Sequence, residues 1–199
     1  MINKRIKWLI SLVARRYRYS RITPLIKRGL IIGGNFQFEK GLLIDKIYPH
    51  LISIGNDVTF SSDIKILAHD AGLKNIMGLA RIGHVKIGNR VFIGVNTIIL
   101  PNVIIGDDVI IGAGSIVSKN IPSGTVCCGV PAKVVCSIEE YKAKILSISK
   151  ECPIFEYSLK PLTMTNRQKQ EQIKLLENSI GLKKTINYSQ LNSLENNYE

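Results

Sequence analysis

The chain has 199 residues, 45% of them hydrophobic, and a net charge of +12. This length predicts one main domain with appendages. The charge is unevenly placed, because residues 1–28 hold nine Lys and Arg and no acid, whereas residues 29–136 and 137–199 are nearly balanced. No known nucleic-acid-binding module accompanies the basic segment, so we expect no nucleic-acid partner.

Residues 1–28 are expected to form a basic amphipathic helical arm. Its apolar positions share one helical face: Ile2, Ile6, Leu9, Leu12 and Val13. The apolar run 8–14 is far shorter than the roughly 20 residues that cross a bilayer, and Arg15 and Arg16 follow where a signal peptide needs small residues. We therefore expect a cytoplasmic protein whose arm packs across the following domain or, through residues 1–20, contacts the inner face of the plasma membrane.

A six-residue repeat runs through residues 87–122 and reads IGNRVF, IGVNTI, ILPNVI, IGDDVI, IGAGSI and VSKNIP. Its first column is Ile87, Ile93, Ile99, Ile105, Ile111 and Val117, and its fifth is Val91, Thr97, Val103, Val109, Ser115 and Ile121. A period of six fits neither an α-helix nor a long strand. It predicts an all-β solenoid in which three short strands close each coil, coils stack about 4.8 Å apart, and both columns point inward.

The same period appears earlier in two weaker series. The first contains Ile32, Phe38 and Ile44, and the second Ile54, Phe60 and Ile66. The register breaks over 45–53 and again over 69–84, where we expect a loop leaving the coil wall. The whole repeat predicts a domain over residues 29–136 with roughly four coils.

Residues 137–199 leave the repeat and are expected to form a helical and irregular extension. SIEEYKAKILSIS predicts one helix, and TNRQKQEQIKLLENSIG a second that ends at Gly181. The four cysteines at 127, 128, 136 and 152 have no metal-site spacing, and we expect buried free thiols in a reducing cytoplasm.

Histidine is the residue most often used as a general base at neutral pH. The chain has three, at positions 50, 69 and 84. His69 opens the loop AHDAGLKNIMGLARIGH and His84 closes it. A side chain at the point where a loop leaves a rigid wall is held firmly yet stays accessible, so His69 is the candidate base, with a solvated loop histidine as the alternative. The spacing of the three histidines, with no paired acid, predicts no metal site.

The repeats, the HD-containing loop and the ending IGAGSIVSKNIPSGTVCCGVPAKVV resemble the hexapeptide-repeat acetyltransferases. The likeness covers about residues 30–140 and is greatest to the maltose/galactoside/xenobiotic branch and to O-acetyltransferases of bacterial surface-polysaccharide clusters. It implies a left-handed parallel β-helix, an exception to the right-handed crossover rule. It also implies acetyl-CoA as co-substrate, a carbohydrate acceptor, and a homotrimer with active sites between subunits.

The activity that this resemblance implies is O-acetyl transfer to a sugar hydroxyl of a surface polysaccharide or its precursor. His69 would take the proton from the acceptor, which attacks the thioester directly, and a backbone N–H of a neighbouring coil would meet the oxyanion. Two alternatives stay open. One is another acceptor (an amino-sugar nitrogen, serine or an antibiotic), and the other is a non-catalytic β-helix scaffold.

The resemblance also assigns binding residues. Asp70 is expected either to partner the His69 imidazole, which the opposite orientation of successive strand residues disfavours, or to contact the sugar acceptor. His84 is also expected near the acceptor, and Phe92 is expected to face outward and line the site. The residues expected at the cofactor are Val95, Ala113, Ser118, Lys119 and Lys133. The usual ILPGV corner is ILPNV here, with Asn102 expected to adopt the left-handed conformation that glycine would supply.

Overall fold

The computed structural model describes residues 20–155, 164–177 and 179–183. The chain divides into two compact units, residues 1–138 and 139–199. Residues 1–19, which carry most of the predicted amphipathic helix and of the predicted membrane contact, lie outside the described part. None of the described helices is long and apolar enough to cross a bilayer.

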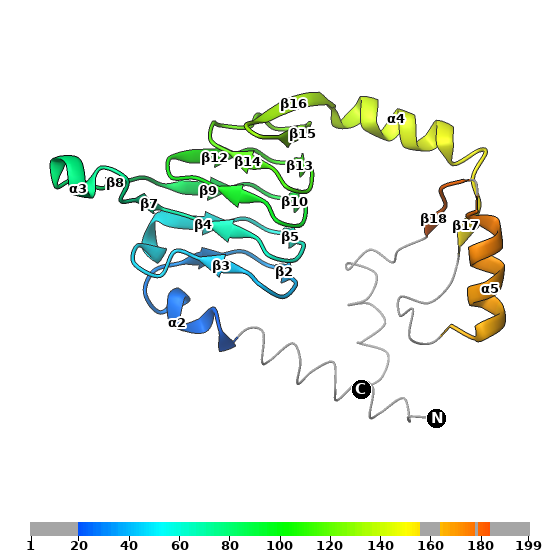
Figure 1. Ribbon diagram of the computed structural model, residues 1–199, viewed down its shortest axis with the longest axis horizontal. Helices are drawn as coiled ribbons and strands as arrows, with labels where there is room; N and C mark the ends of the chain where they lie inside the picture. Colours follow the sequence, from blue (N-terminus) through cyan, green and yellow to red (C-terminus); the bar gives the residue numbers. More distant parts are fainter. Residues whose placement is uncertain (1–19, 156–163, 178, 184–199) are drawn as a thin grey trace. The chain divides into compact units, whose positions relative to one another are not determined.

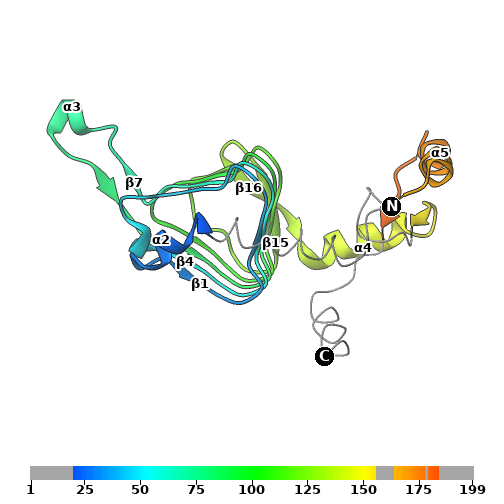
Figure 2. The same ribbon diagram turned by 90° about the horizontal axis from the view of Figure 1, so that it is seen from below.

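The first unit is a stack of three-sided coils (Figures 1 and 2). Face A consists of β1 (Ile31–Ile32), β4 (Ile52–Ile54), β9 (Val85–Ile87) and β12 (Val103–Ile105). Face B consists of β2 (Gln37–Phe38), β5 (Thr59–Phe60), β10 (Phe92–Ile93), β13 (Ile110–Ile111), β15 (Thr125–Gly129) and β16 (Ala132–Ser137). Face C consists of β3 (Leu43–Ile44), β6 (Lys65–Ile66), β11 (Ile98–Ile99) and β14 (Ile116–Val117). The chain visits A, B and C in turn, which gives the four predicted coils and part of a fifth.

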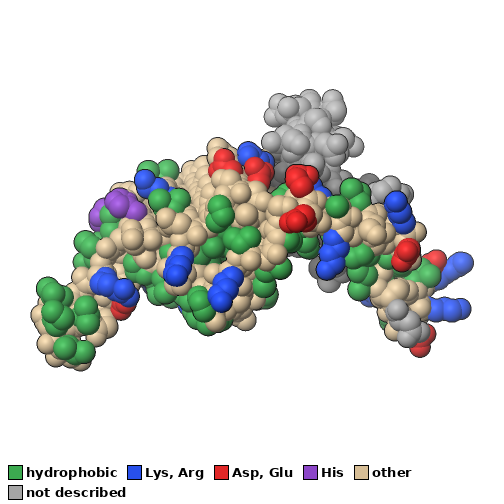
Figure 3. All heavy atoms as spheres, turned by 90° about the horizontal axis from the view of Figure 1, so that it is seen from above, with side chains coloured by type: hydrophobic (Ala, Val, Ile, Leu, Met, Phe, Trp, Pro, Cys, Tyr) green, Lys and Arg blue, Asp and Glu red, His purple; other side chains and the backbone are tan. Residues whose placement is uncertain are grey.

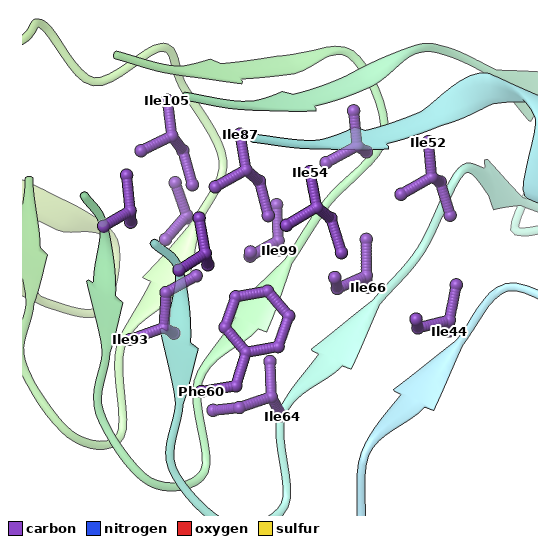
Figure 4. Close-up of a cluster of buried hydrophobic side chains, with 14 of the residues drawn as sticks. Ile44, Ile52, Ile54, Phe60, Ile64, Ile66, Ile87, Ile93, Ile99 and Ile105 are labelled. Atoms are coloured by element: carbon purple, nitrogen blue, oxygen red, sulfur yellow. The ribbon is translucent and has the colours of Figure 1, made fainter. Parts of the chain in front are cut away.

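Equivalent repeat positions stack on one another because neighbouring coils pair in parallel. Ile93 pairs with Phe60 below and Ile111 above, and Ile99 lies between Ile66 and Val117 in the same way. Every residue of the two predicted inward columns is at most 4% exposed, and the aliphatic side chains fill the interior in layers (Figure 4). The inward orientation of both columns is confirmed.

The corners between faces are made by residues in the left-handed conformation. Seven of them are not glycine: Asn35, Asp57, Asp63, Arg90, Asn96, Asn102 and Asp108. Asn102 has φ of 63°, so the expected left-handed turn is confirmed. Arg90 is an uncommon residue there, and its guanidinium donates to both carboxylate oxygens of Asp108, each at 2.7 Å.

Two additions close the ends of the solenoid. A short helix, α2 (Thr23–Ile26), lies below the first coil, where Ile22 and Leu25 are buried in the solenoid core. At the other end β16 turns back antiparallel on β15. The described end of the basic arm therefore packs across the first coil, as one of the two sequence hypotheses expects.

The second unit contains short elements. Helix α4 (Ile138–Ile148) leads into it, followed by β17 (Ile154–Phe155), α5 (Asn166–Leu175) and β18 (Leu182–Lys183). Helix α5 begins with a capping box between Thr165 and Gln168 and ends before Gly181, so the expected helix end at Gly181 is wrong. Gly181 instead precedes the parallel pairing of β17 with β18, where a Cβ would lie 2.6 Å from the Phe155 ring.

The cysteines only partly follow the sequence expectation. Cys127 is buried, and its burial, followed by the charge of its neighbour Cys128, raises the pKa of its thiol to about 11. Cys128 is exposed, because successive residues of β15 point to opposite sides, so the expectation of buried thiols is wrong for Cys128. Within the described ranges no group of three His, Cys, Asp or Glu could hold a metal ion.

Two neighbouring isoleucines on β12 allow a test of whether the first-column residues point into the core. Ile105 is 1% exposed and Ile104, next to it on β12, is 49% exposed. Ile105→Ala should lower the free energy of unfolding by about 2–5 kcal/mol, and Ile104→Ala by less than about 1 kcal/mol. Urea unfolding of both variants at one protein concentration measures this, and equal losses would contradict the observed alternation.

Candidate functional site

His69 lies where the solenoid wall opens. The chain leaves face C at β6, and β7 (His69–Asp70) then pairs antiparallel with β8 (Arg81–Ile82) to form the stalk of a projecting loop. The loop carries a single helical turn, α3 (Lys74–Met77), and rejoins the wall at β9. The His69 side chain is 28% exposed, so its ring is held by the wall and remains accessible to solvent, as the sequence predicts.

A buried carboxylate holds the His69 ring. Asp45 follows β3 one coil below, and its side chain is fully buried. One oxygen accepts from the backbone N–H of Ile47 at 2.9 Å and of Tyr48 at 3.2 Å, and the other accepts from Ala68 N–H at 2.9 Å and contacts His69 Nδ1. Because an ionised carboxylate only accepts hydrogen bonds, a neutral His69 ring in this contact is expected to carry its proton on Nδ1 and to keep its lone pair on Nε2.

The environment of Asp45 favours its ionised form. Burial would raise the pKa of this carboxyl, but the hydrogen bonds from His69 and from three backbone N–H groups outweigh that effect and hold the pKa below its ordinary value. A negative charge therefore lies against Nδ1 at neutral pH. Such a charge stabilises the imidazolium that forms when Nε2 takes a proton.

Asp70, the acid next to His69 in sequence, has a different partner. Its carboxylate accepts from Arg81 across the stalk at 2.5 Å and from Gly72 N–H at 2.8 Å. The hydrogen bond from Arg81, followed by that from Gly72, lowers the pKa of Asp70. Asp70 thus fixes the loop, and its expected contact with the acceptor stays a prediction.

Sequence reasoning missed Asp45, although one signal was present. Asp45 follows the inward Ile44 directly and begins the first break in register. Both breaks occur where the chain passes from face C to face A of the next coil. Because the coils stack in register, segments 45–51 and 67–84 lie on the same edge of the solenoid, the C–A edge, in consecutive coils.

The other predicted residues fall into separate groups. Phe92 lies on face B, is 44% exposed and points outward, as expected. Val95 and Ala113 lie on the edge between faces B and C, the B–C edge, where Gly114 N–H donates to the Val95 carbonyl at 2.7 Å. A Cβ on Gly94 would come within 2.5 Å of Ala113 N, so this edge requires glycine for the close approach of its coils.

Ser118 and Lys119 follow β14 on the C–A edge, two coils above His69. Lys133 is exposed on β16. His84 is exposed where the loop rejoins the wall, and its carbonyl accepts from Val103 N–H. One chain therefore places His69, Ser118 and Lys119 on one edge and Val95 and Ala113 on another.

Apolar side chains gather on the projecting loop, which lies at the far left of Figure 3. The exposed members are Leu73, Ile76, Met77, Leu79 and Ile82. Exposed apolar groups concentrated in one place indicate a surface that another molecule covers.

The chain resembles a family model and several known proteins. The family model described as bacterial transferase hexapeptide (six repeats) matches residues 84–119. Protein CapG of Staphylococcus aureus is 36% identical over 174 residues, which cover 83% of this chain and 98% of CapG. Galactoside O-acetyltransferase of Escherichia coli (strain K12) is 36% identical over 114 residues, covering 55% of this chain and 54% of that enzyme. The crystal structure of a maltose O-acetyltransferase from Clostridium difficile 630 is 37% identical over 53% of this chain and 57% of its own, with a TM-score of 0.48.

This chain belongs to the bacterial hexapeptide-repeat transferases, because the family model matches its repeats and its likeness to CapG extends over most of this chain and nearly all of CapG. Membership of this family implies the left-handed winding expected from the sequence. Since several relatives are named acetyltransferases, the prediction that the chain is an acyltransferase is confirmed at the level of enzyme class.

The hydrogen bonds of Asp45 give a pH-dependent prediction. A pKa held below its ordinary value of 3.8 contributes stability above that value, which is lost as the pH falls through the folded-state pKa. Asp45→Asn should therefore lower the free energy of unfolding by about 1–3 kcal/mol at pH 7, and the deficit should shrink towards pH 3.

Urea unfolding at pH 7, 5 and 3 measures this deficit. Asp63→Asn is the matched control, because Asp63 is exposed on the B–C edge and its φ of 61° is one that asparagine tolerates. A deficit for Asp45→Asn that is the same at all three pH values would contradict the assignment of a buried, ionised carboxylate.

Proposed function

We propose that this protein is an acetyl-CoA-dependent O-acetyltransferase that acts on a sugar hydroxyl of a surface polysaccharide or its precursor. The observation that carries the proposal is the contact of His69 Nδ1 with the buried Asp45 carboxylate, which holds a partly exposed imidazole where the projecting loop leaves the solenoid. The names of two relatives support the acceptor class: galactoside O-acetyltransferase, and the putative lipopolysaccharide biosynthesis O-acetyl transferase WbbJ of Escherichia coli (strain K12).

His69 acts as the general base in this proposal. Nε2 takes the proton of the acceptor hydroxyl as its oxygen attacks the thioester carbonyl of acetyl-CoA. Asp45 stabilises the resulting imidazolium and keeps Nδ1 protonated. When the tetrahedral intermediate collapses, the C–S bond breaks and His69 returns the proton to the departing CoA thiolate. The products are the acetyl ester and CoA, and no covalent enzyme intermediate is needed.

The cofactor groove is proposed to use the small residues of the B–C edge and the cations of the upper coils. Ala113 and Val95 leave room for the pantetheine arm beside the backbone. Lys133 and Lys119 are both exposed and supply positive charge for the nucleotide phosphates. Phe92, outward on face B, would lie along the same groove.

We propose a homotrimer with the active sites between subunits. The support is the separation within one chain of His69, on the C–A edge, from Val95 and Ala113, on the B–C edge. Pairing the C–A edge of one subunit with the B–C edge of the next would complete a site, and a cyclic trimer repeats that contact with closure. The exposed apolar residues of the loop would then be covered by the neighbouring subunit.

His69→Ala tests the base. Loss of a general base should reduce kcat about 10²–10⁴-fold, measured as CoA thiol release from acetyl-CoA with a panel of nucleotide sugars and oligosaccharides. CoA binding by calorimetry serves as the control and should stay unchanged. A variant that transfers acetyl at the wild-type rate would disprove the base assignment, and a wild-type protein that binds no CoA would indicate a scaffold.

Complementation between two inactive variants tests the shared site. His69→Ala removes the base, and Ala113→Trp should block the pantetheine path. Co-expressed chains that mix at random should recover about a quarter of wild-type activity, because some sites then combine an intact C–A edge with an intact B–C edge from different subunits. Purified mixed trimers with no recovered activity would show that each site lies within one chain.

A further inference from the structure

Residues 45–51, within the first break in register, form a turn between β3 and β4. The proposed mechanism uses this turn only through Asp45. The turn contains a 3₁₀ helix, η1 (Pro49–Leu51). The Asp45 carboxylate accepts from the backbone N–H of Ile47 and of Tyr48. The group that holds the His69 ring therefore also fixes the backbone at Tyr48.

The Tyr48 ring lies against the His69 ring. The centroids of the Tyr48 and His69 rings are 5.5 Å apart, and the ring planes meet at 62°. Tyr48 also contacts His50, with centroids 6.1 Å apart and ring planes at 65°. Tyr48 is half-buried and packs against the solenoid core. An edge-to-face contact at this separation is favourable, and a ring packed on the core cannot easily move away from it.

We propose that Tyr48 is a positioning residue for His69, an inference that rests on the proposed function. The hydrogen bond from Nδ1 to Asp45 fixes one point of the imidazole, and the ring can still tilt about that point. Contact with the Tyr48 ring restrains this tilt. Together the two contacts fix the direction of the Nε2 lone pair towards the acceptor hydroxyl.

The orientation of a base has a large effect on rate, because a misplacement of about 1 Å can reduce turnover about 10²-fold.

The charged groups near His69 do not replace Tyr48 in restraining the imidazole ring. Asp45 contacts only the Nδ1 side, and Asp70 is held by Arg81. Tyr48 is thus the neighbouring side chain placed to restrain the plane of the imidazole.

Tyr48→Leu and Tyr48→Phe test the proposal. Leucine keeps apolar bulk and removes the ring, so kcat should fall about 10–100-fold, while the KM for acetyl-CoA changes less than about twofold. Phenylalanine keeps the ring and should restore kcat to within about threefold of wild type. Leu51→Ala is the matched control, since Leu51 lies in the same turn and packs on the same core, and it should keep kcat near wild type at temperatures where it is folded.

A double-mutant cycle separates positioning from a general structural effect. In the His69→Ala background, Tyr48→Leu should cause no further loss of kcat, because the residue that it positions is absent. An equal further loss there would overturn the proposal. An increase in the KM for the sugar acceptor with unchanged kcat would also overturn it, and would make Tyr48 an acceptor-binding residue instead.

The outcome for His69→Ala alone distinguishes a failure of the proposed function from a failure of the positioning role of Tyr48. If that variant keeps wild-type activity, the proposed function fails and the role of Tyr48 fails with it. If His69→Ala is inactive and Tyr48→Leu retains full kcat, the base assignment stands and only the positioning role is wrong.

Discussion

Successive side chains of a β-strand point to opposite faces, so each short strand of the three-sided coil sends only its alternate side chains into the interior. In the repeat these are the first- and fifth-column residues, and stacking in register places each against its equivalents above and below. The regular solenoid therefore has little room for chemistry inside its wall. Polar function has to be built on the faces and edges, or where the repeat is interrupted.

Asp45 is the exception within this core. Among the described residues, the buried polar or charged ones are Asp45, Thr97 and Ser115, and only Asp45 carries a charge. A buried carboxylate is costly unless its oxygens are well satisfied, and here three backbone N–H groups and an imidazole surround it. The stability of that arrangement and the orientation of His69 consequently depend on the same hydrogen bonds.

The two interruptions of the repeat act together because they occupy the same place in consecutive coils. One supplies Asp45 and Tyr48, and the other supplies His69 and the projecting loop. Residues 24 positions apart in sequence thereby come into direct contact, since one turn of the solenoid returns the chain to the same edge. An interruption on either of the other two edges would have placed its side chains far from the base.

The regular part of this fold was predictable from the sequence because its information is local and repeated. The inward columns, the four coils, the outward Phe92 and the left-handed Asn102 all follow from position within the hexad. Asp45 and Tyr48 were not predictable in the same way, because the break at 45–53 hides how many residues separate consecutive coils. Sequence neighbours also mislead, since Asp70 adjoins His69 in the chain and is instead held by Arg81.

The role of His69 as a base depends on which ring nitrogen carries the proton, and this can be observed directly. Nitrogen-15 NMR of the histidine side chains, assigned with a His69→Ala variant, reports the tautomer of the neutral ring. We expect neutral His69 to be protonated at Nδ1, towards Asp45, with Nε2 unprotonated. A neutral ring protonated at Nε2 would leave no lone pair facing the acceptor and would contradict the assignment of His69 as the base.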